Sequence, residues 1–444
     1  MLRTFINAWK VADLRKKILY TALILLLFRL GSWIPVPFLD PGIMAQGGIV
    51  AATDETFMSY LSMLTGGAFS YGTIFAMSIT PFINSSIIMQ LLTVALPPLE
   101  RLAKEGESGR KKIASITRYL TVGLAALQST GYYFYLKNGG YLMTNADGAA
   151  FTGGWAVFQA FVIVLVLTAG SALIMWMGEQ INEKGIGNGI SLILFAGIVA
   201  RIPAIATQLY DYMRRGGAYY ALVPITIVLL LGIVAFIVFM DKSERRIPVQ
   251  YAKRVVGRKM YGGQSTHIPI KVNMSGVMPI IFASSILSLP ATIGMFIDYE
   301  EGSGWDTFFG LFSQRSPFYG CVYFLLIIFF AYFYATIQYN PIEMANNIRK
   351  NSGAIPGIRP GKPTSDYITK ILSKITLLGA LMLSVVALFP IVFSQLTSLI
   401  MDNEGMTIAM GGTSVIILVG VALETVKQLE SQLMMRHYKG FLDN

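Results

Sequence analysis

Long apolar runs separated by polar segments dominate the pattern of hydrophobic and polar positions along this 444-residue chain. A helix needs about 20 apolar residues to cross the hydrocarbon core of a bilayer. Barrel strands would be about ten residues long and would alternate in polarity, which excludes a membrane β-barrel. The pattern therefore predicts an all-α polytopic membrane protein with ten transmembrane helices, at residues 18–34, 73–94, 117–136, 155–177, 188–206, 221–240, 276–296, 318–338, 372–393 and 412–431.

The positions of the basic residues predict the orientation of these helices. Of the 35 Lys and Arg residues, 29 lie in the N-terminal arm, in alternate loops and near the C-terminus, and only five lie in the loops of the other side. Lys and Arg favour cytoplasmic loops, so both termini are expected in the cytoplasm. The cytoplasmic parts are then an amphipathic arm on the inner leaflet, two large loops and a tail, at residues 1–17, 241–273, 341–374 and 432–444.

Two short sequence patterns of the first half recur in the second half. An apolar helix interrupted by Pro81 carries a Ser-Ser pair after the proline, as does the helix with Pro279, and Gly189-Ile-Ser is echoed by Gly412-Thr-Ser. The alternative is chance similarity among the small residues common in membrane helix contacts. Five spans per half is an odd number, so residues 207–431 are expected to run inverted relative to residues 18–206. Matching broken helices predict a path between the halves.

The chemistry of the predicted spans limits what this path can conduct. Ion-coupled transporters keep Asp, Glu or His near the bilayer midplane, and these spans carry almost none. Their centres are aliphatic, which suits a deformable hydrophobic constriction. Cys321, His267 and His437 have no partners at metal-ligand spacing, so we expect no metal site. The sequence has no phosphate-binding Gly-x-x-x-x-Gly-Lys-Ser/Thr loop, so the energy for transport is expected to come from a partner.

The cytoplasmic loops are more basic than orientation alone requires. Residues 241–273 hold eight Lys and Arg residues, and residues 341–374 hold six. Orientation together with contact to anionic lipid is one interpretation. The other is a docking surface for a large acidic partner, either nucleic acid or an acidic protein face.

Four motifs resemble the bacterial SecY family, whose members are the channel subunits of the Sec protein translocon. They are Gly-Glu-Ser-Gly-Arg-Lys-Lys at 106–112, Gly-Glu-Gln-Ile at 178–181 with Gly-Ile-Gly-Asn-Gly-Ile-Ser at 185–191, Gln-Ser-Thr-His at 264–267 with Lys-Val-Asn-Met at 271–274, and Pro-Gly-Ile-Arg-Pro-Gly at 356–361. The resemblance runs from the arm to the last span. It implies a channel for secretory polypeptides with two inverted five-helix halves around an hourglass pore, and no enzymatic activity.

The resemblance also implies site residues. A pore ring that seals the waist corresponds to Ile79, Ile83, Ile190, Leu194, Met278 and Ile417. A plug that folds back into the funnel corresponds to about residues 60–71, with Tyr60, Leu61, Met63, Leu64, Gly66, Gly67, Ala68 and Phe69. The sideways opening between spans two and three and spans seven and eight, the lateral gate, would involve Gln90, Gln128, Ser284 and Ser285. Docking of the motor or ribosome would involve Arg245, Arg246, Arg254, Arg258, Lys259 and Arg359.

The partners implied are SecE-like and SecG-like small membrane subunits, the motor ATPase SecA, the ribosome, signal sequences, nascent polypeptides and anionic phospholipids. The implied location is the bacterial plasma membrane, and no cofactor, metal or small-molecule substrate is expected. A secondary transporter for a small solute is the alternative, because it would share inverted repeats and broken helices. A membrane-embedded enzyme would need paired carboxylates, a Ser/His pair or a metal set within the spans, and none is present.

Overall fold

The computed structural model describes residues 2–40, 62, 65–144, 151–217, 219–251, 254–256, 259–261, 265–294, 303–313, 316–400 and 412–442. The helices of the first half are α1 (Leu2–Lys10), α2 (Ala12–Gly31), α5 (Thr80–Ala95), α6 (Pro97–Lys104), α7 (Glu107–Asn138), α8 (Gly154–Lys184) and α9 (Gly189–Ala200). Those that follow are α10 (Ile202–Arg215), α11 (Tyr219–Lys242), α12 (Met278–Gly294), α13 (Gly304–Leu311), α14 (Pro317–Gln338), α15 (Pro341–Lys350), α16 (Lys362–Ile400) and α17 (Gly412–Leu442).

The predicted all-α polytopic membrane architecture is confirmed. Within the described residues, six stretches are long and apolar enough to cross a membrane: α8, α9 with α10, α11, α14 with α15, α16 and α17. The bent pair α5 and α6 would make a seventh. The three remaining predicted spans correspond to α2, α7 and α12, which are helical but less apolar or shorter.

The sequence predicted that Pro81 interrupts a helix, and this prediction was wrong. Pro81 instead lies in the first turn of a helix. Residues 65–79 form turns, and α5 starts at Thr80 with the proline in its first turn. A proline is tolerated there because the first amide groups of a helix have no intrahelical acceptor. Pro279 is likewise the second residue of α12. Each helix is preceded by a residue with positive φ two positions before its start, Ser78 (+47°) and Gly276 (+62°), so the repeat extends to the backbone.

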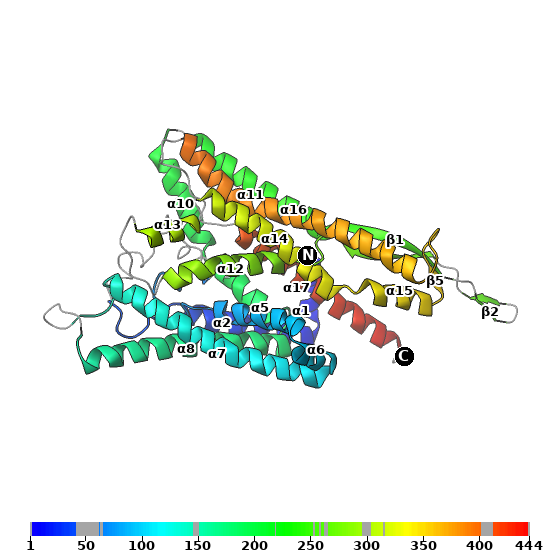
Figure 1. Cartoon of the computed structure of the whole chain (residues 1–444), viewed down its shortest axis with the longest axis horizontal. Coiled ribbons are helices and arrows are strands. Elements are labelled where there is room, and N and C mark those ends of the chain that lie inside the picture. Colours follow the sequence, from blue (N-terminus) through cyan, green and yellow to red (C-terminus); the bar gives the residue numbers. More distant parts are fainter. Residues whose placement is uncertain are drawn as a thin grey trace.

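The two large loops form a small sheet that the sequence analysis did not predict. Strand β1 (Glu244–Tyr251) pairs antiparallel with β4 (Ser265–Lys271) on one side and with β5 (Gly353–Ala354) on the other. The strands β2 (Arg254–Val256) and β3 (Lys259–Tyr261) form a separate antiparallel pair. Ile247, Val249 and Ile270 are buried beneath the sheet together with residues of α15 and α16. The sheet thus joins the two loops into one unit at one end of the molecule (Figure 1).

Helices of the first half, α2, α5, α7 and α8, lie on one side of the molecule, and α11, α14 and α16 lie on the other (Figure 1). The helices that carry the repeated sequence patterns contact each other across the boundary between the two halves: α5 contacts α12, and α9 contacts α17. α12 also contacts α7, and it packs closely on α14. The line along which α5 and α7 meet α12 and α14, called the seam below, is therefore a boundary between the halves.

Candidate functional site

Five of the six residues predicted for the pore ring lie in one hydrophobic cluster. Ile79, Leu194 and Ile417 are buried in it, and Ile83 and Ile190 pack against it partly buried. They come from the start of α5, from α9 and from α17, so three helices of two halves bring together side chains that are far apart in the sequence. An apolar collar without a charged group excludes ions and water while remaining deformable.

Met278, the sixth predicted ring residue, packs against a neighbouring cluster. It lies at the first residue of α12 and is partly buried. Ile83 packs against both clusters, as do Val277 and Ile281 of the same segment as Met278. The structure therefore places all six residues in two adjoining clusters that share side chains between the halves.

The described part of the predicted plug, Ser62 and residues 65–71, is called the plug segment below. Tyr60, Leu61, Met63 and Leu64 lie outside the described residues. Gly66 and Gly67 have φ of +67° and +95°, a backbone conformation that glycine adopts without steric cost. Ala68 and Phe69 are buried, and the Tyr132 hydroxyl donates a hydrogen bond to the Phe69 carbonyl oxygen at 2.7 Å. The plug segment is therefore packed inside the first half.

A cavity of about 530 Å³ opens between α5, α7, α8 and α14, on the seam. Gln90 lines it opposite Tyr334 and Gln338 of α14, and most of the remaining wall is apolar. The other residues predicted for the lateral gate do not line this cavity. Gln128 is partly buried on α7, and the Ser284 hydroxyl donates to the Ile281 carbonyl oxygen of its own helix. Ser285 is partly buried on α12.

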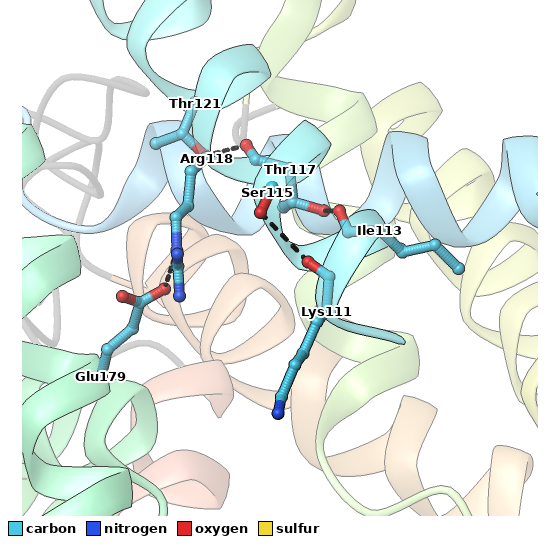
Figure 2. A network of polar contacts seen from close by, with 7 residues as sticks. All are labelled: Lys111, Ile113, Ser115, Thr117, Arg118, Thr121 and Glu179. Atoms are coloured by element: carbon cyan, nitrogen blue, oxygen red, sulfur yellow. Dashed lines mark hydrogen bonds and ion pairs between the residues drawn. The ribbon is translucent and has the colours of Figure 1, made fainter. Parts of the chain in front are cut away.

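Glu179, which lines this cavity, forms an ion pair that joins two helices of the first half. Arg118 Nε of α7 lies 2.7 Å from Glu179 Oε1 of α8 (Figure 2). On the same face of α7, the Thr117 and Thr121 hydroxyls donate to backbone carbonyl oxygens one turn earlier, so they leave the pair undisturbed (Figure 2). Both charged side chains are partly exposed, which limits the contribution of the pair to about 1 kcal/mol or less. It therefore adds only a weak polar contact to the packing of α7 on α8 beside the seam.

The described docking residues of the prediction lie on β1, on the separate β2–β3 pair and in the loop before α16. Arg245 and Arg246 are exposed on β1, and Arg254 and Lys259 belong to β2 and β3. Arg258 lies outside the described residues. Arg359 is exposed, and its carbonyl oxygen accepts a hydrogen bond from the buried Thr364 hydroxyl at 2.9 Å. Its loop is thereby tied to α16 while its side chain extends into solvent.

Sequence reasoning missed two residues that contact the plug segment. Arg29 lies within the first predicted span, residues 18–34, and Arg201 lies near the end of the predicted span at residues 188–206. Each donates a hydrogen bond to the plug segment. An arginine inside an apolar run is a signal of function, because a charge is costly in the hydrocarbon region. Its acceptor could not be read from the sequence.

Comparisons with known proteins give the family. The model of the SecY family matches residues 73–426. The chain belongs to the SecY family. Relatives named protein translocase subunit SecY are 44% identical in Mycobacterium tuberculosis and 43% identical in Streptomyces coelicolor, and each alignment covers 100% of both chains.

Solved structures show the same fold. The chain matches the structure titled "The structure of a protein conducting channel" with a TM-score of 0.62 at 17% identity, over 94% of this chain and 92% of the other. It also matches the Sec61 chain of the canine ribosome–channel complex, with a TM-score of 0.60 at 16% identity and the same coverage. At these identities the likeness concerns the SecY fold alone.

Proposed function

We propose that this chain is the protein-conducting channel subunit of a Sec translocase. It lets secretory polypeptides cross the membrane and releases transmembrane segments sideways into lipid. Membership of the SecY family supports this function, and it supports a channel rather than an enzyme. The observation in the molecule that carries the proposal is the convergence of aliphatic side chains from α5, α9 and α17 between the two halves. A secondary transporter of a small solute is not favoured.

The pore ring and the seam would act in sequence. An unfolded polypeptide can push flexible aliphatic side chains apart, whereas hydrated ions would lose their water without gaining new ligands. A hydrophobic signal sequence can then leave through the seam between α5 with α7 and α12 with α14, because its apolar core prefers hydrocarbon. Gln90, which lines the cavity on the seam, would then present a polar group to that segment.

The working assembly proposed here contains SecE-like and SecG-like small membrane subunits and receives its cargo from SecA or from the ribosome. The exposed arginines of β1 and Arg359 support docking at the sheet end of the molecule. Anionic phospholipids would contact the same basic loops. The proposed location is the bacterial plasma membrane with both termini in the cytoplasm, which the distribution of Lys and Arg supports.

Crosslinking tests the channel directly. A photoreactive residue in place of Ile79 or Ile190 is expected to crosslink to a secretory chain stalled in transit, because both side chains lie in the apolar cluster at the waist. The same residue in place of Leu231, exposed on α11, is the matched control and should not react with the cargo. Equal crosslinking from Leu231 and from Ile79, or none from either waist position, would contradict the channel.

Gln90→Leu is expected to change the stringency of signal-sequence recognition. Gln90 is partly buried, and a polar side chain at the seam favours the closed state, whereas an apolar one lowers the cost of admitting a signal of weaker hydrophobicity. Export of a precursor with a defective signal sequence should therefore rise several-fold relative to a normal precursor. Gln128→Leu, on α7 but away from the cavity, serves as the comparison. Unchanged stringency in Gln90→Leu counts against a role of this residue in the gate.

A further inference from the structure

Two arginines from different helices donate hydrogen bonds to the plug segment. Arg29 Nη1, near the end of α2, lies 3.1 Å from the Gly66 carbonyl oxygen. Arg201 Nη1, between α9 and α10, lies 3.0 Å from the Ser62 hydroxyl oxygen, which also bonds to the Ser70 hydroxyl. The two arginines therefore bind the plug segment at Ser62 and at Gly66, four residues apart.

Both arginines are placed where a positive charge is costly. The apolar run of the first span contains Arg29, and Arg201 follows the twelve apolar or small residues of α9. Within the described part of the chain, neither guanidinium forms an ion pair with a carboxylate. Arg29 stacks over Trp33 at 5.7 Å, and among the described residues it donates a hydrogen bond to the plug segment. An arginine in a span needs hydrogen-bond acceptors, because an unpaired charge there is costly. If the plug segment moves away, each arginine loses the acceptor that this segment supplies.

The hydrogen bonds between the plug segment and other described elements all go to the first half. Besides the two arginines, Tyr132 of α7 bonds to the Phe69 carbonyl oxygen. The turns after the plug segment continue this attachment, since the Val36 amide donates to the Gly72 carbonyl oxygen and the Ile74 amide donates to that of Ile34. Separation of the halves along the seam breaks none of these bonds. Opening of the seam and release of the plug are therefore two distinct events.

We propose that Arg29 and Arg201 form a two-point latch that keeps the plug segment on the first half, and that the translocating polypeptide releases it by offering the arginines replacement acceptors. This inference rests on the proposed channel function. The acceptor at Gly66 is a backbone carbonyl, a group that every residue of a passing chain presents. The two guanidinium groups thus bind the plug in the resting channel and the backbone of the cargo in the active one.

Close packing at Gly66 makes the latch sensitive to geometry. A Cβ atom at this position would lie 2.9 Å from the Gly197 carbonyl oxygen and 3.4 Å from Arg29 Nη1, and φ there is +67°. Gly66→Ala is therefore expected to push the segment off α9 and to weaken the bond from Arg29. The variant tests the same contact from the side of the plug, with both cations intact.

The experiment measures ion leak through the reconstituted translocase in planar bilayers, together with export of a precursor with a defective signal sequence. Arg29→Gln and Arg201→Gln are each expected to raise the leak roughly tenfold, in keeping with the loss of one hydrogen bond to a charged group. Ser62→Ala should reproduce the effect of Arg201→Gln, because it removes the acceptor and leaves the charge. Arg214→Gln is the matched control, since Arg214 is exposed and stacks over Tyr210.

The outcomes separate the latch from the channel function. If the wild-type complex exports normal precursors and the Gln variants, Ser62→Ala and Gly66→Ala all leak no more than Arg214→Gln, the latch is wrong and the channel stands. If the wild-type complex itself neither exports nor leaks under any condition, the proposed function fails first. Arg29→Lys and Arg201→Lys keep the charge and an N–H donor group but lose the planar guanidinium, so a leak between those of wild type and Gln supports hydrogen bonding to the plug. A leak in Arg214→Gln equal to that in Arg201→Gln assigns the effect to general charge and overturns the proposal.

Discussion

Arg359→Glu is expected to abolish SecA-driven export, by at least about a hundredfold, while the protein still folds and inserts. The side chain is exposed, and its loop is held by the bond from Thr364 to the Arg359 carbonyl oxygen, which the substitution leaves in place. A guanidinium on a fixed loop presents donors to an acidic partner, and a carboxylate there repels the same partner. ATP-dependent uptake of a precursor into reconstituted vesicles measures the effect.

Lys362→Glu provides the matched control for that experiment. Lys362 is exposed at the start of α16, three residues from Arg359, and its reversal changes the net charge by the same amount. We expect it to reduce export only a few-fold. Normal export by Arg359→Glu would refute the docking role, and equal loss in both variants would assign the effect to the charge of the loop as a whole.

The second large effect is expected from Gly189→Ala, which should destabilise the bundle. A Cβ atom at Gly189 would lie 2.0 Å from the Gly178 carbonyl oxygen of α8, so α8 and α9 must move apart. The turn before α9 cannot absorb this shift freely, because the Gly189 amide donates to Asn182 Oδ1 and Asn188 caps the helix. Overpacking of this kind lowers the free energy of unfolding by about 3 kcal/mol. The thermal stability of the purified complex in detergent reports the loss.

Gly232→Ala is the control for Gly189→Ala, because a Cβ atom at Gly232 of α11 meets no atom within 4 Å. Alanine has a higher helix propensity than glycine, so this variant should be at least as stable as the wild type. A Gly189→Ala protein with unchanged melting temperature and unchanged yield would show that the α8–α9 contact is softer than its geometry indicates.

Some features of the fold could be predicted from the sequence because they depend on local composition. The ten apolar runs predict helices, since a backbone in hydrocarbon must satisfy its own hydrogen bonds. The repeat around Pro81 and Pro279 was also detectable, because the residues that follow each proline are similar. Its interpretation as a break in a helix was wrong. The position of a proline relative to the helix start depends on the preceding turns, and the positive φ of Ser78 and Gly276 is not evident from the pattern.

The sheet formed by the two large loops could not be predicted from the local sequence. β1 pairs with β5 across about a hundred residues, Gln250 opposite Ala354, and short basic strands carry little apolar alternation. Long-range pairing of this kind is decided by the packing of the sheet on α15 and α16. The sequence therefore indicated the charge of the two basic loops, and the tertiary structure supplied their shape.

The sequence by itself determined that this protein is a helical membrane protein, where its basic residues gather along the chain and which family motifs it carries. Those properties follow from the transfer of each segment between water and lipid, which depends on composition. Only the tertiary structure decided which aliphatic residues meet in one cluster between the halves, that Gln90 and not Gln128 lines the cavity at the seam, and that Arg29 and Arg201 donate hydrogen bonds to the plug segment. The reason is physical: these contacts join residues far apart in the chain, and the packing of whole helices fixes them.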